Sequence, residues 1–316
     1  MNKSRHSRPT AARRGAAPAP VVACFGEILW DCLPRGLFLG GAPANAGYHL
    51  AQQGLRVLPV SAVGRDFLGE EALRRIGGWG GVDTRFIARS ARRPTGTVRA
   101  ELDRDGVATY RFAADVAWDR IPVPAKIGKQ SPAPAAVVYG TLALRETPNR
   151  RALASLFARW PEALRVVDLN FREPFATRAA ISFALQHAQF VKLNDDELAT
   201  LVGRRASTPT ALRRSTETFV RRHGIDRVCV TAGARGAGLW WGGEWHWEPG
   251  REVRVRDTVG AGDAFLGGLL GALLGREANP AQALASACRM GEFVASRDGA
   301  TPPYTLGARF LPADPA

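Results

Sequence analysis

The sequence predicts an α/β fold in which a mostly parallel sheet is covered by helices on both faces. Short apolar segments alternate with segments of helical periodicity from residue 136 to residue 194, as is typical of such sheets. A hairpin pattern over residues 97–112 interrupts the alternation and should protrude from the main sheet. The 316 residues, 46% hydrophobic and 23% charged, suffice for one large or two ordinary domains.

The net charge of +14 is spread along the chain rather than gathered in one patch. Residues 1–20 carry basic side chains and no acid, and we expect them to form a disordered basic leader. Elsewhere the excess is arginine, since lysine occurs only at Lys3, Lys126, Lys129 and Lys192. We interpret this as a solvated surface with some preference for anionic substrates, not as a specific nucleic-acid site.

The cysteines and the apolar segments indicate a cellular compartment. Cys24, Cys32, Cys229 and Cys288 form no Cys-x-x-Cys pair, so neither a zinc site nor a disulfide framework is predicted. No apolar run approaches the ~20 residues that span a bilayer. We therefore expect a cytoplasmic protein without a membrane partner.

The first third of the chain contains the earliest candidate site. Residues 21–26 form an apolar run ending in glycine, which predicts a buried first strand. A glycine turn at residues 40–41 then opens a helix of small residues, within which Asn45 is polar without a packing reason. Residues 57–64 are predicted as the second strand and 69–76 as a helix.

The middle of the chain settles into regular alternation. Residues 136–140, 166–170 and 190–194 are predicted strands, with helices at 149–159 and 179–187 between them. Ligands of such sheets gather at the carboxyl ends of the strands, where Asp168, Asn170 and Arg172 follow one strand and Asn194 and Glu197 the next. Later segments predict a strand at 228–232, a hairpin at 238–247 and a closing helix at 280–296.

The stretch from Val253 to Phe265 predicts a strand, a glycine turn and a helix. Backbone N–H groups of such a turn at Gly260, Ala261 and Gly262 can hold an anion such as a phosphate, because the helix dipole adds positive charge. Asp263 stands in the first helical turn, where an acid often only stabilises the helix. Beside an anion-binding turn, however, it can serve as the base for phosphoryl transfer to a hydroxyl.

Two motifs carry a family resemblance. The segment 40–45, Gly-Gly-Ala-Pro-Ala-Asn, and the segment 257–263, Asp-Thr-Val-Gly-Ala-Gly-Asp, resemble in this order the two signatures of the ribokinase-like (PfkB) carbohydrate kinases. The Ala-Pro-Ala-Asn form is most similar to the fructokinase branch. The resemblance covers about residues 21–304 and implies a ribokinase-like kinase domain over 21–316. It also implies a small β-sheet lid, formed by about 31–39 and 92–118, through which a homodimer is an expectation.

The resemblance implies ATP-dependent phosphorylation of fructose or a related keto-sugar on a terminal hydroxyl. By this resemblance Asp263 is the general base, and the N–H groups of Gly260, Ala261 and Gly262 stabilise the transferring phosphoryl group. Small-molecule sugar and ATP are then the partners. The residues implied to hold the sugar are Asp31, Gly40, Gly41, Asn45, Arg172 and Asp263.

The nucleotide side follows from further matches. The segment 194–197 resembles the family's Asn-x-x-Glu motif, in which the glutamate, here Glu197, orders the water shell of Mg2+. Asp257 is implied to contribute to a monovalent-cation site, for which K+ is the candidate. The residues implied to border ATP are Asn194, Thr231, Gly233, Gly236 and Gly262.

Several alternatives stay open at this point. The acids at 195–197 form a plain acidic helix start just as well as a magnesium motif. Within the family, the acceptor can instead be 2-keto-3-deoxygluconate, ribose or a nucleoside. A non-catalytic sugar or nucleic-acid binder is the alternative of another class, and retention of Asp263 argues against it because a binder needs no base.

Overall fold

We analysed a computed structural model that describes residues 18–33, 36–102, 108–123, 127, 132–307 and 311–315. Residues 1–17, and with them most of the expected basic leader, lie outside this described part. Within it, no helix is both long enough and apolar enough to cross a lipid bilayer.

The main sheet of the described residues has nine strands, and its pairs from β5 to β11 are parallel. β12 and β13 add an antiparallel hairpin at one edge. The predicted mostly parallel sheet is therefore confirmed. In spatial order the strands are β13 (Glu244–Pro249), β12 (Gly236–Trp241), β11 (Arg227–Thr231), β10 (Phe190–Asn194), β9 (Leu164–Asp168), β8 (Ala136–Gly140), β1 (Val21–Phe25), β4 (Arg56–Gly64) and β5 (Ile87–Ser90).

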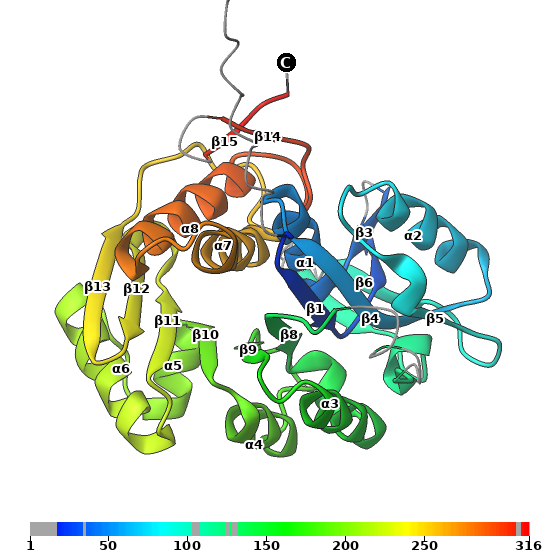
Figure 1. The fold of residues 1–316 in the computed structure, drawn as a ribbon, viewed down its shortest axis with the longest axis horizontal. Helices are drawn as coiled ribbons and strands as arrows, with labels where there is room; N and C mark the ends of the chain where they lie inside the picture. The colour runs from blue at the N-terminus through cyan, green and yellow to red at the C-terminus, as the bar shows by residue number, and fades with distance from the viewer. Residues whose placement is uncertain are drawn as a thin grey trace, which may run out of the picture.

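Helices cover both faces of this sheet (Figure 1). One face carries α1 (Ala42–Gln52), α7 (Ala261–Leu270) and α8 (Pro280–Ala295), and the π-helical turn Gly271–Gly275 extends α7. The other face carries α3 (Thr147–Arg159), α4 (Arg178–His187), α5 (Asp195–Val202) and α6 (Pro209–His223), while α2 (Phe67–Gly77) lies beside β4. The remaining short elements are the 3-10 turns Thr84–Phe86, Ala117–Arg120, Leu142–Arg145 and Gly233–Arg235 and the pair β14 (Thr305–Leu306) and β15 (Pro312–Ala313).

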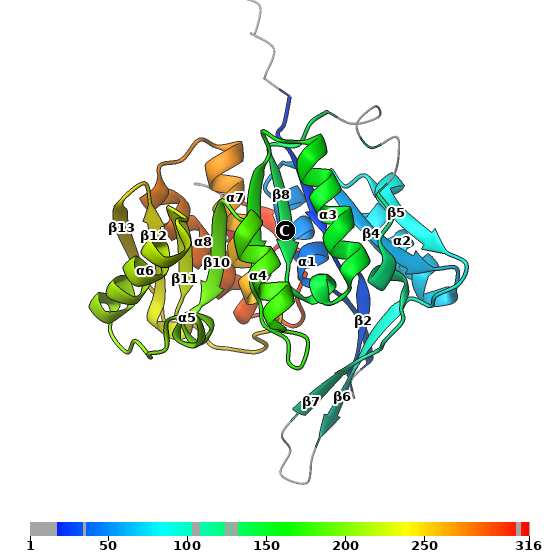
Figure 2. The ribbon, with the colours of Figure 1, turned by 90° about the horizontal axis from the view of Figure 1, so that it is seen from below.

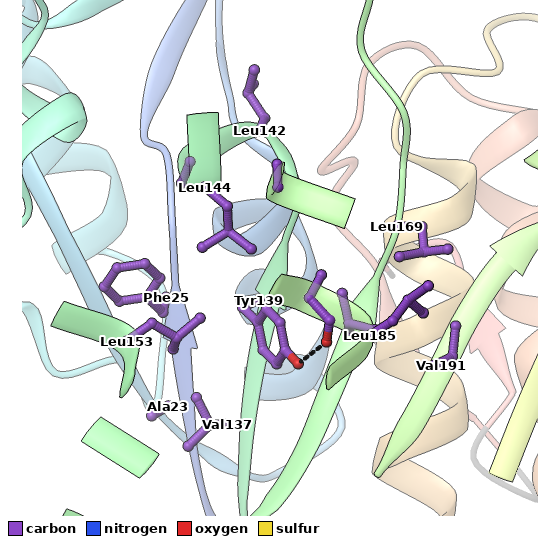
Figure 3. Close-up of a cluster of buried hydrophobic side chains, with 14 of the residues drawn as sticks. Ala23, Phe25, Val137, Tyr139, Leu142, Leu144, Leu153, Leu169, Leu185 and Val191 are labelled. Carbon is purple, nitrogen blue, oxygen red and sulfur yellow. Dashed lines mark hydrogen bonds between the residues drawn. The ribbon is translucent and has the colours of Figure 1, made fainter. Parts of the chain in front are cut away.

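Apolar side chains on both faces of the main sheet form two buried clusters, one under each layer of helices. In β1, Ala23 and Phe25 point into the core on the α3 and α4 face, whereas Val22 and Cys24 point into the core under α1, α7 and α8. A strand buried on both faces must be apolar at every position, which is why the run 21–25 does not alternate. Figure 3 shows the first core, in which the Tyr139 hydroxyl donates to the Ala184 carbonyl at 2.9 Å.

A second, four-stranded sheet stands apart from the first. Its order is β3 (Gly36–Gly40), β2 (Leu29–Leu33), β6 (Gly96–Leu102) and β7 (Ala108–Phe112). The predicted hairpin is confirmed by the antiparallel pairing of β6 with β7, and its turn, residues 103–107, lies outside the described residues. The ends of β6 and β7 project well beyond the main body (Figure 2).

The strand predicted around Val253 and Val255 is wrong. Residues 251–255 have no regular structure, and Val255 is 58% exposed. β13 ends at Pro249, and among the described residues no strand pairs with 251–255, so the alternation there has no partner. Instead, the N–H groups of Arg256 and Asp257 donate to the carbonyl of Ala295 at the end of α8. This contact fixes the segment that leads into the turn at residue 260.

Candidate active site

Asp263 lies at the centre of the polar residues that the fold brings together. It stands in the first turn of α7 and is 8% exposed. Its Oδ2 accepts a hydrogen bond of 2.9 Å from Asn45 Nδ2 in α1. Burial, reinforced by the negative charge of Asp168, raises the pKa of Asp263 to about 7. The two motifs of the sequence therefore meet in one hydrogen bond, and the acid titrates near neutral pH.

The turn before Asp263 is held by close backbone packing. Gly260 adopts a left-handed conformation with φ of 77°, and a Cβ there would lie 2.4 Å from Cβ of Ala300. The N–H of Ala261 donates to the Thr258 carbonyl at 3.2 Å. Of the three N–H groups predicted to hold an anion, this one therefore already has an acceptor within the turn. The Lys192 ammonium lies beside Gly262, where a Cβ would be 3.0 Å from its Nζ.

Asp257 fixes the same turn from its other side. Its Oδ1 accepts from the N–H of Val259 at 3.0 Å, and its Oδ2 accepts from the N–H of Gly299 at 3.3 Å. The carboxylate thus ties the segment before α7 to the loop that follows α8.

The start of α1 forms the opposite wall. Gly41 has φ of 113°, and a Cβ there would lie 2.3 Å from the Glu27 carbonyl oxygen, so only glycine fits. A Cβ on Gly40 would lie 2.4 Å from Oδ2 of Asp31, which shows that the Asp31 carboxylate covers this glycine. Burial raises the pKa of Asp31 to about 6, although Arg172 opposes the shift.

Glu27 is a site residue that the sequence analysis did not single out. It is 3% exposed, and its Oε1 accepts from the N–H of Ala42 at the start of α1 at 3.1 Å. Its Oε2 and the Oδ1 of Asn45 are buried acceptors without a hydrogen-bond donor among the described residues. Buried polar atoms in native proteins nearly always have a partner, so these two oxygens point to a ligand that donates hydrogen bonds. The signal in the sequence was an acid directly after an apolar strand and Gly26.

Arg172 is exposed, and it follows β9 as the sequence predicted. Its positive charge lowers the pKa of Asp31, of Glu27 and of Asp263, although burial dominates the pKa of all three acids.

A buried ion pair lies beneath the turn at 260–262. Lys192 in β10 donates from Nζ to Oδ2 of Asp168, at the end of β9, over 2.8 Å. The sequence analysis noted Asp168 but missed Lys192. Its signal was a lysine inside an apolar strand, in a chain that otherwise uses arginine almost throughout.

Glu197 caps the helix α5 and lies close to the ion pair. Its Oε2 accepts from the N–H of Asn194, its Oε1 accepts from the N–H of Phe171, and Asn194 Oδ1 accepts from the N–H of Glu197. This is a capping box, so the helix-start alternative describes the local structure correctly. Each carboxylate oxygen keeps a further lone pair, which fits contact with a metal-bound water. Among the described residues, no group of three or more His, Cys, Asp or Glu side chains could hold a metal ion directly.

The remaining predicted residues lie on the β11–β12 side. Thr231 ends β11, and in the sheet it is the Cα partner of Asn194. Gly233 has φ of 56° and nothing within 4 Å of a Cβ position, so its conformation, not close packing, selects glycine. Gly236 is different, because a Cβ there would lie 2.1 Å from the Glu248 carbonyl oxygen in β13. That close approach explains Gly236 without a ligand, and its contact with a nucleotide stays a prediction.

The family described as "pfkB family carbohydrate kinase" matches residues 32–305. A fructokinase of Escherichia coli is 28% identical over 266 residues, which cover 79% of this chain and 83% of that relative. An aminoimidazole riboside kinase of Salmonella typhimurium is 30% identical over 241 residues, covering 73% of this chain and 72% of the relative.

Solved structures give the same picture of the fold. A fructokinase from Vibrio cholerae O395, bound to fructose, ADP and calcium, superposes with a TM-score of 0.73 at 24% identity over 89% of this chain and 94% of its own. A double mutant of that fructokinase was solved with fructose, ADP and potassium.

Proposed function

Since the chain belongs to the pfkB family of carbohydrate kinases, and is therefore a sugar kinase, we propose that it transfers the terminal phosphoryl group of ATP to fructose or a related keto-sugar. The acceptor is a terminal hydroxyl, and Asp263 is the general base. One observation carries the assignment of the base: the hydrogen bond of 2.9 Å between Asn45 and Asp263 joins the two family motifs in a buried site.

The proposed chemistry uses the two oxygens of Asp263 differently. Oδ2 is held by Asn45, which leaves Oδ1 to accept the proton of the sugar hydroxyl. As that proton leaves, the hydroxyl oxygen forms its bond to the γ-phosphorus, and ADP takes the electrons of the bond that breaks. A base whose pKa is about 7 is half ionised at neutral pH and still accepts a proton well, which suits general base catalysis.

The transferring phosphoryl group lies in this proposal over the turn at residues 260–262. N–H groups there and the start of the α7 dipole stabilise the negative charge. The N–H of Ala261 must exchange its contact with the Thr258 carbonyl to take part. That carbonyl contact is long, at 3.2 Å, and hence readily given up.

The sugar side offers hydrogen-bond acceptors, which fits a polyol. Asn45 Oδ1 and Glu27 Oε2 lack donors among the described residues, and Asp31 stands beside Gly40. Hydroxyl groups would supply the missing donors and fix the acceptor for in-line attack. We assign Arg172, an exposed side chain whose charge acts on Asp31 and Asp263, to the substrate or to the transferring phosphoryl group.

Nucleotide and cations complete the proposal. Mg2+ would neutralise charge on the phosphates, with Glu197 holding its waters rather than binding it directly. Asp257, Asn194, Thr231, Gly233 and Gly236 are assigned to the nucleotide side, with Asp257 contributing to a K+ site. The relatives' structures with ADP and calcium or potassium support cation use at such sites.

The proposal also covers the cellular location and the oligomeric state of the protein. We infer a cytoplasmic enzyme, supported by four free cysteines and by ATP as the phosphoryl donor. We also infer a homodimer through the small sheet, in which Leu37 of β3 is 49% exposed and an open sheet edge favours covering. No specific nucleic-acid partner is part of the proposal.

A nucleoside kinase is the second candidate, because the Salmonella relative at 30% identity acts on an aminoimidazole riboside. Transfer of phosphate from ATP should be measured side by side with fructose, ribose, 2-keto-3-deoxygluconate, adenosine and aminoimidazole riboside. We expect the highest kcat/KM with fructose. A higher value with either riboside would replace fructose by a nucleoside and leave the kinase chemistry in place.

A further inference from the structure

Two buried charges beneath the turn have no part in the chemistry described so far. Lys192 is 6% exposed and Asp168 is 4% exposed, and they form an ion pair of 2.8 Å. Their α-carbons are register partners across β9 and β10, so two adjacent strands fix the pair. Burying two charges is costly, and an apolar pair would stabilise such a core at least as well. The pair therefore calls for an explanation beyond stability.

The position of the pair supplies one. A Cβ on Gly262 would lie 3.0 Å from Lys192 Nζ, which places the ammonium directly behind the residue preceding Asp263. Burial alone would lower the pKa of Lys192, but the charges of Asp168, Glu197 and Asp263 raise it, so the ammonium stays protonated. Asp168 Oδ1 is buried without a partner among the described residues, and its negative charge therefore stays poorly compensated on that side.

Few other charges face Asp263. From the loop after β9, Arg172 acts in the same direction as Lys192, and from α1 the uncharged Asn45 donates a hydrogen bond. His49 lies one turn further along, against Gly267, and its burial lowers its pKa to about 4, which keeps it neutral. From α8 and the loop after it, the uncharged Gly291 and Ala300 lie close to the start of α7. Glu197 of α5 acts on Lys192.

We propose that Asp168 and Lys192 are positioning residues of opposite sign that together set the proton occupancy of Asp263. Lys192 favours the ionised carboxylate, and Asp168 favours the protonated one. The two charges oppose each other, so removing either one alone should shift the protonation of Asp263, and in opposite directions, whereas removing both should shift it less. This inference rests on the proposed role of Asp263 as general base.

The opposite signs make the test specific. Lys192→Gln removes the positive charge but keeps a donor for Asp168, and Asp168→Asn removes the negative charge but keeps an acceptor for Lys192. Lys192→Arg retains the charge and serves as the matched control. The double variant Asp168→Asn/Lys192→Gln removes both charges at once and leaves no unpaired buried ion. We therefore expect it to fold even if a single variant does not.

The titration of Asp263 should be followed directly in the substrate-free protein, by 13C NMR of aspartate-labelled samples. Asp263→Asn identifies its signal. We expect the midpoint to rise by about one pH unit in Lys192→Gln and to fall by about one pH unit in Asp168→Asn. It should return to within about 0.3 of the wild-type value in the double variant and in Lys192→Arg. The acidic limb of kcat/KM for the sugar should move with it.

A purely structural role predicts something else. Both single variants would then lose activity or thermal stability, while the midpoint of Asp263 stayed in place or moved in the same direction in both; either result overturns the inference. A midpoint in the double variant that remains a full pH unit from the wild-type value overturns it as well. The NMR titration needs no substrate, so opposite shifts without turnover of fructose would refute the proposed acceptor and leave this inference standing.

Discussion

The turn at 260–263 and the small sheet reach the same site from two sides, but the protein holds them differently. Asp263 is 8% exposed, held by Asn45 and enclosed by the main core. Asp31 is half-buried in a sheet whose ends project from the body. Leu37, which is paired with Cys32 in the neighbouring strand, is 49% exposed. Asp263 is thus fixed by burial and by a hydrogen bond from a second helix, whereas the sugar side rests on a few strands.

This difference suggests a division of labour. Phosphoryl transfer to any hydroxyl needs the same base and the same anion-binding turn, so these gain from a rigid position. The acceptor pocket must exclude water around a particular sugar, and a separate sheet that closes over it can do so. We therefore expect changes in the turn to affect turnover of every acceptor, and changes in the small sheet to affect mainly the choice and affinity of the sugar.

The largest effect is expected at the base. Asp263→Asn should lower kcat by ~10²- to 10⁴-fold for every acceptor, because the amide cannot take the hydroxyl proton. Steady-state assays on the substrate panel check this. An unchanged kcat would remove Asp263 from the chemistry and with it the comparison between the two sides.

Thermal unfolding provides the control for the same variant. The folded-state pKa of Asp263, about 7, lies above its ordinary value of 3.8, so the folded protein binds the proton more tightly than the unfolded chain. The stability that this proton contributes is fully present below pH 3.8 and is lost as the pH rises through 7. At pH 8, Asp263→Asn should therefore unfold at a temperature equal to or above that of the wild type, which separates lost chemistry from lost folding.

The next effect concerns the rigidity of the turn. Gly260→Ala should lower the free energy of unfolding by about 1–2 kcal/mol through left-handed strain and by about 1–3 kcal/mol through collision with Ala300. Gly299→Ala is a matched control, because Gly299 has φ of 78° and nothing within 4 Å of a Cβ position. It should show only the strain. Equal losses in chemical denaturation would mean that Ala300 does not brace the turn.

The smallest effect is expected on the sugar side. Asp31→Asn should raise the KM for fructose by ~10- to 100-fold, because a hydroxyl loses a charged acceptor. The KM for ATP and the kcat should change little. Cys32→Ser, at the next position of the same strand, is the control for disturbance of β2. A fall in kcat as large as that of Asp263→Asn would show that both sides take part equally in the chemical step.

Much of this molecule could be predicted from its sequence, for physical reasons. Strands buried on both faces must be apolar throughout, and helices must repeat their apolar positions, so β1, β8, β9 and β10 were recognisable. The strand predicted around Val253 does not form, because alternation of apolar and polar residues shows only that a segment can become a strand. A strand also needs a partner, and among the described residues no strand pairs with 251–255.

The site shows the same limit at the level of side chains. The motifs identified Asn45 and Asp263, and their adjacency followed from the family resemblance. Lys192 could not be found this way. Its importance comes from its position beside Gly262, and no spacing along the chain reveals that β10 and the start of α7 meet there. Nor could the sequence show that the Ala261 N–H has an acceptor at Thr258, because backbone contacts are independent of residue type.

The contact between Asn45 and Asp263 spans 218 positions of the chain. During synthesis, the amide is made early and the carboxylate only after most of the 316 residues have left the ribosome. Closing a contact between residues so distant in sequence carries a large entropic cost, and proteins rich in such contacts fold slowly. On the proposed mechanism, a chain that stops before Asp263 has no base, so we expect such a fragment to show no phosphoryl transfer from ATP.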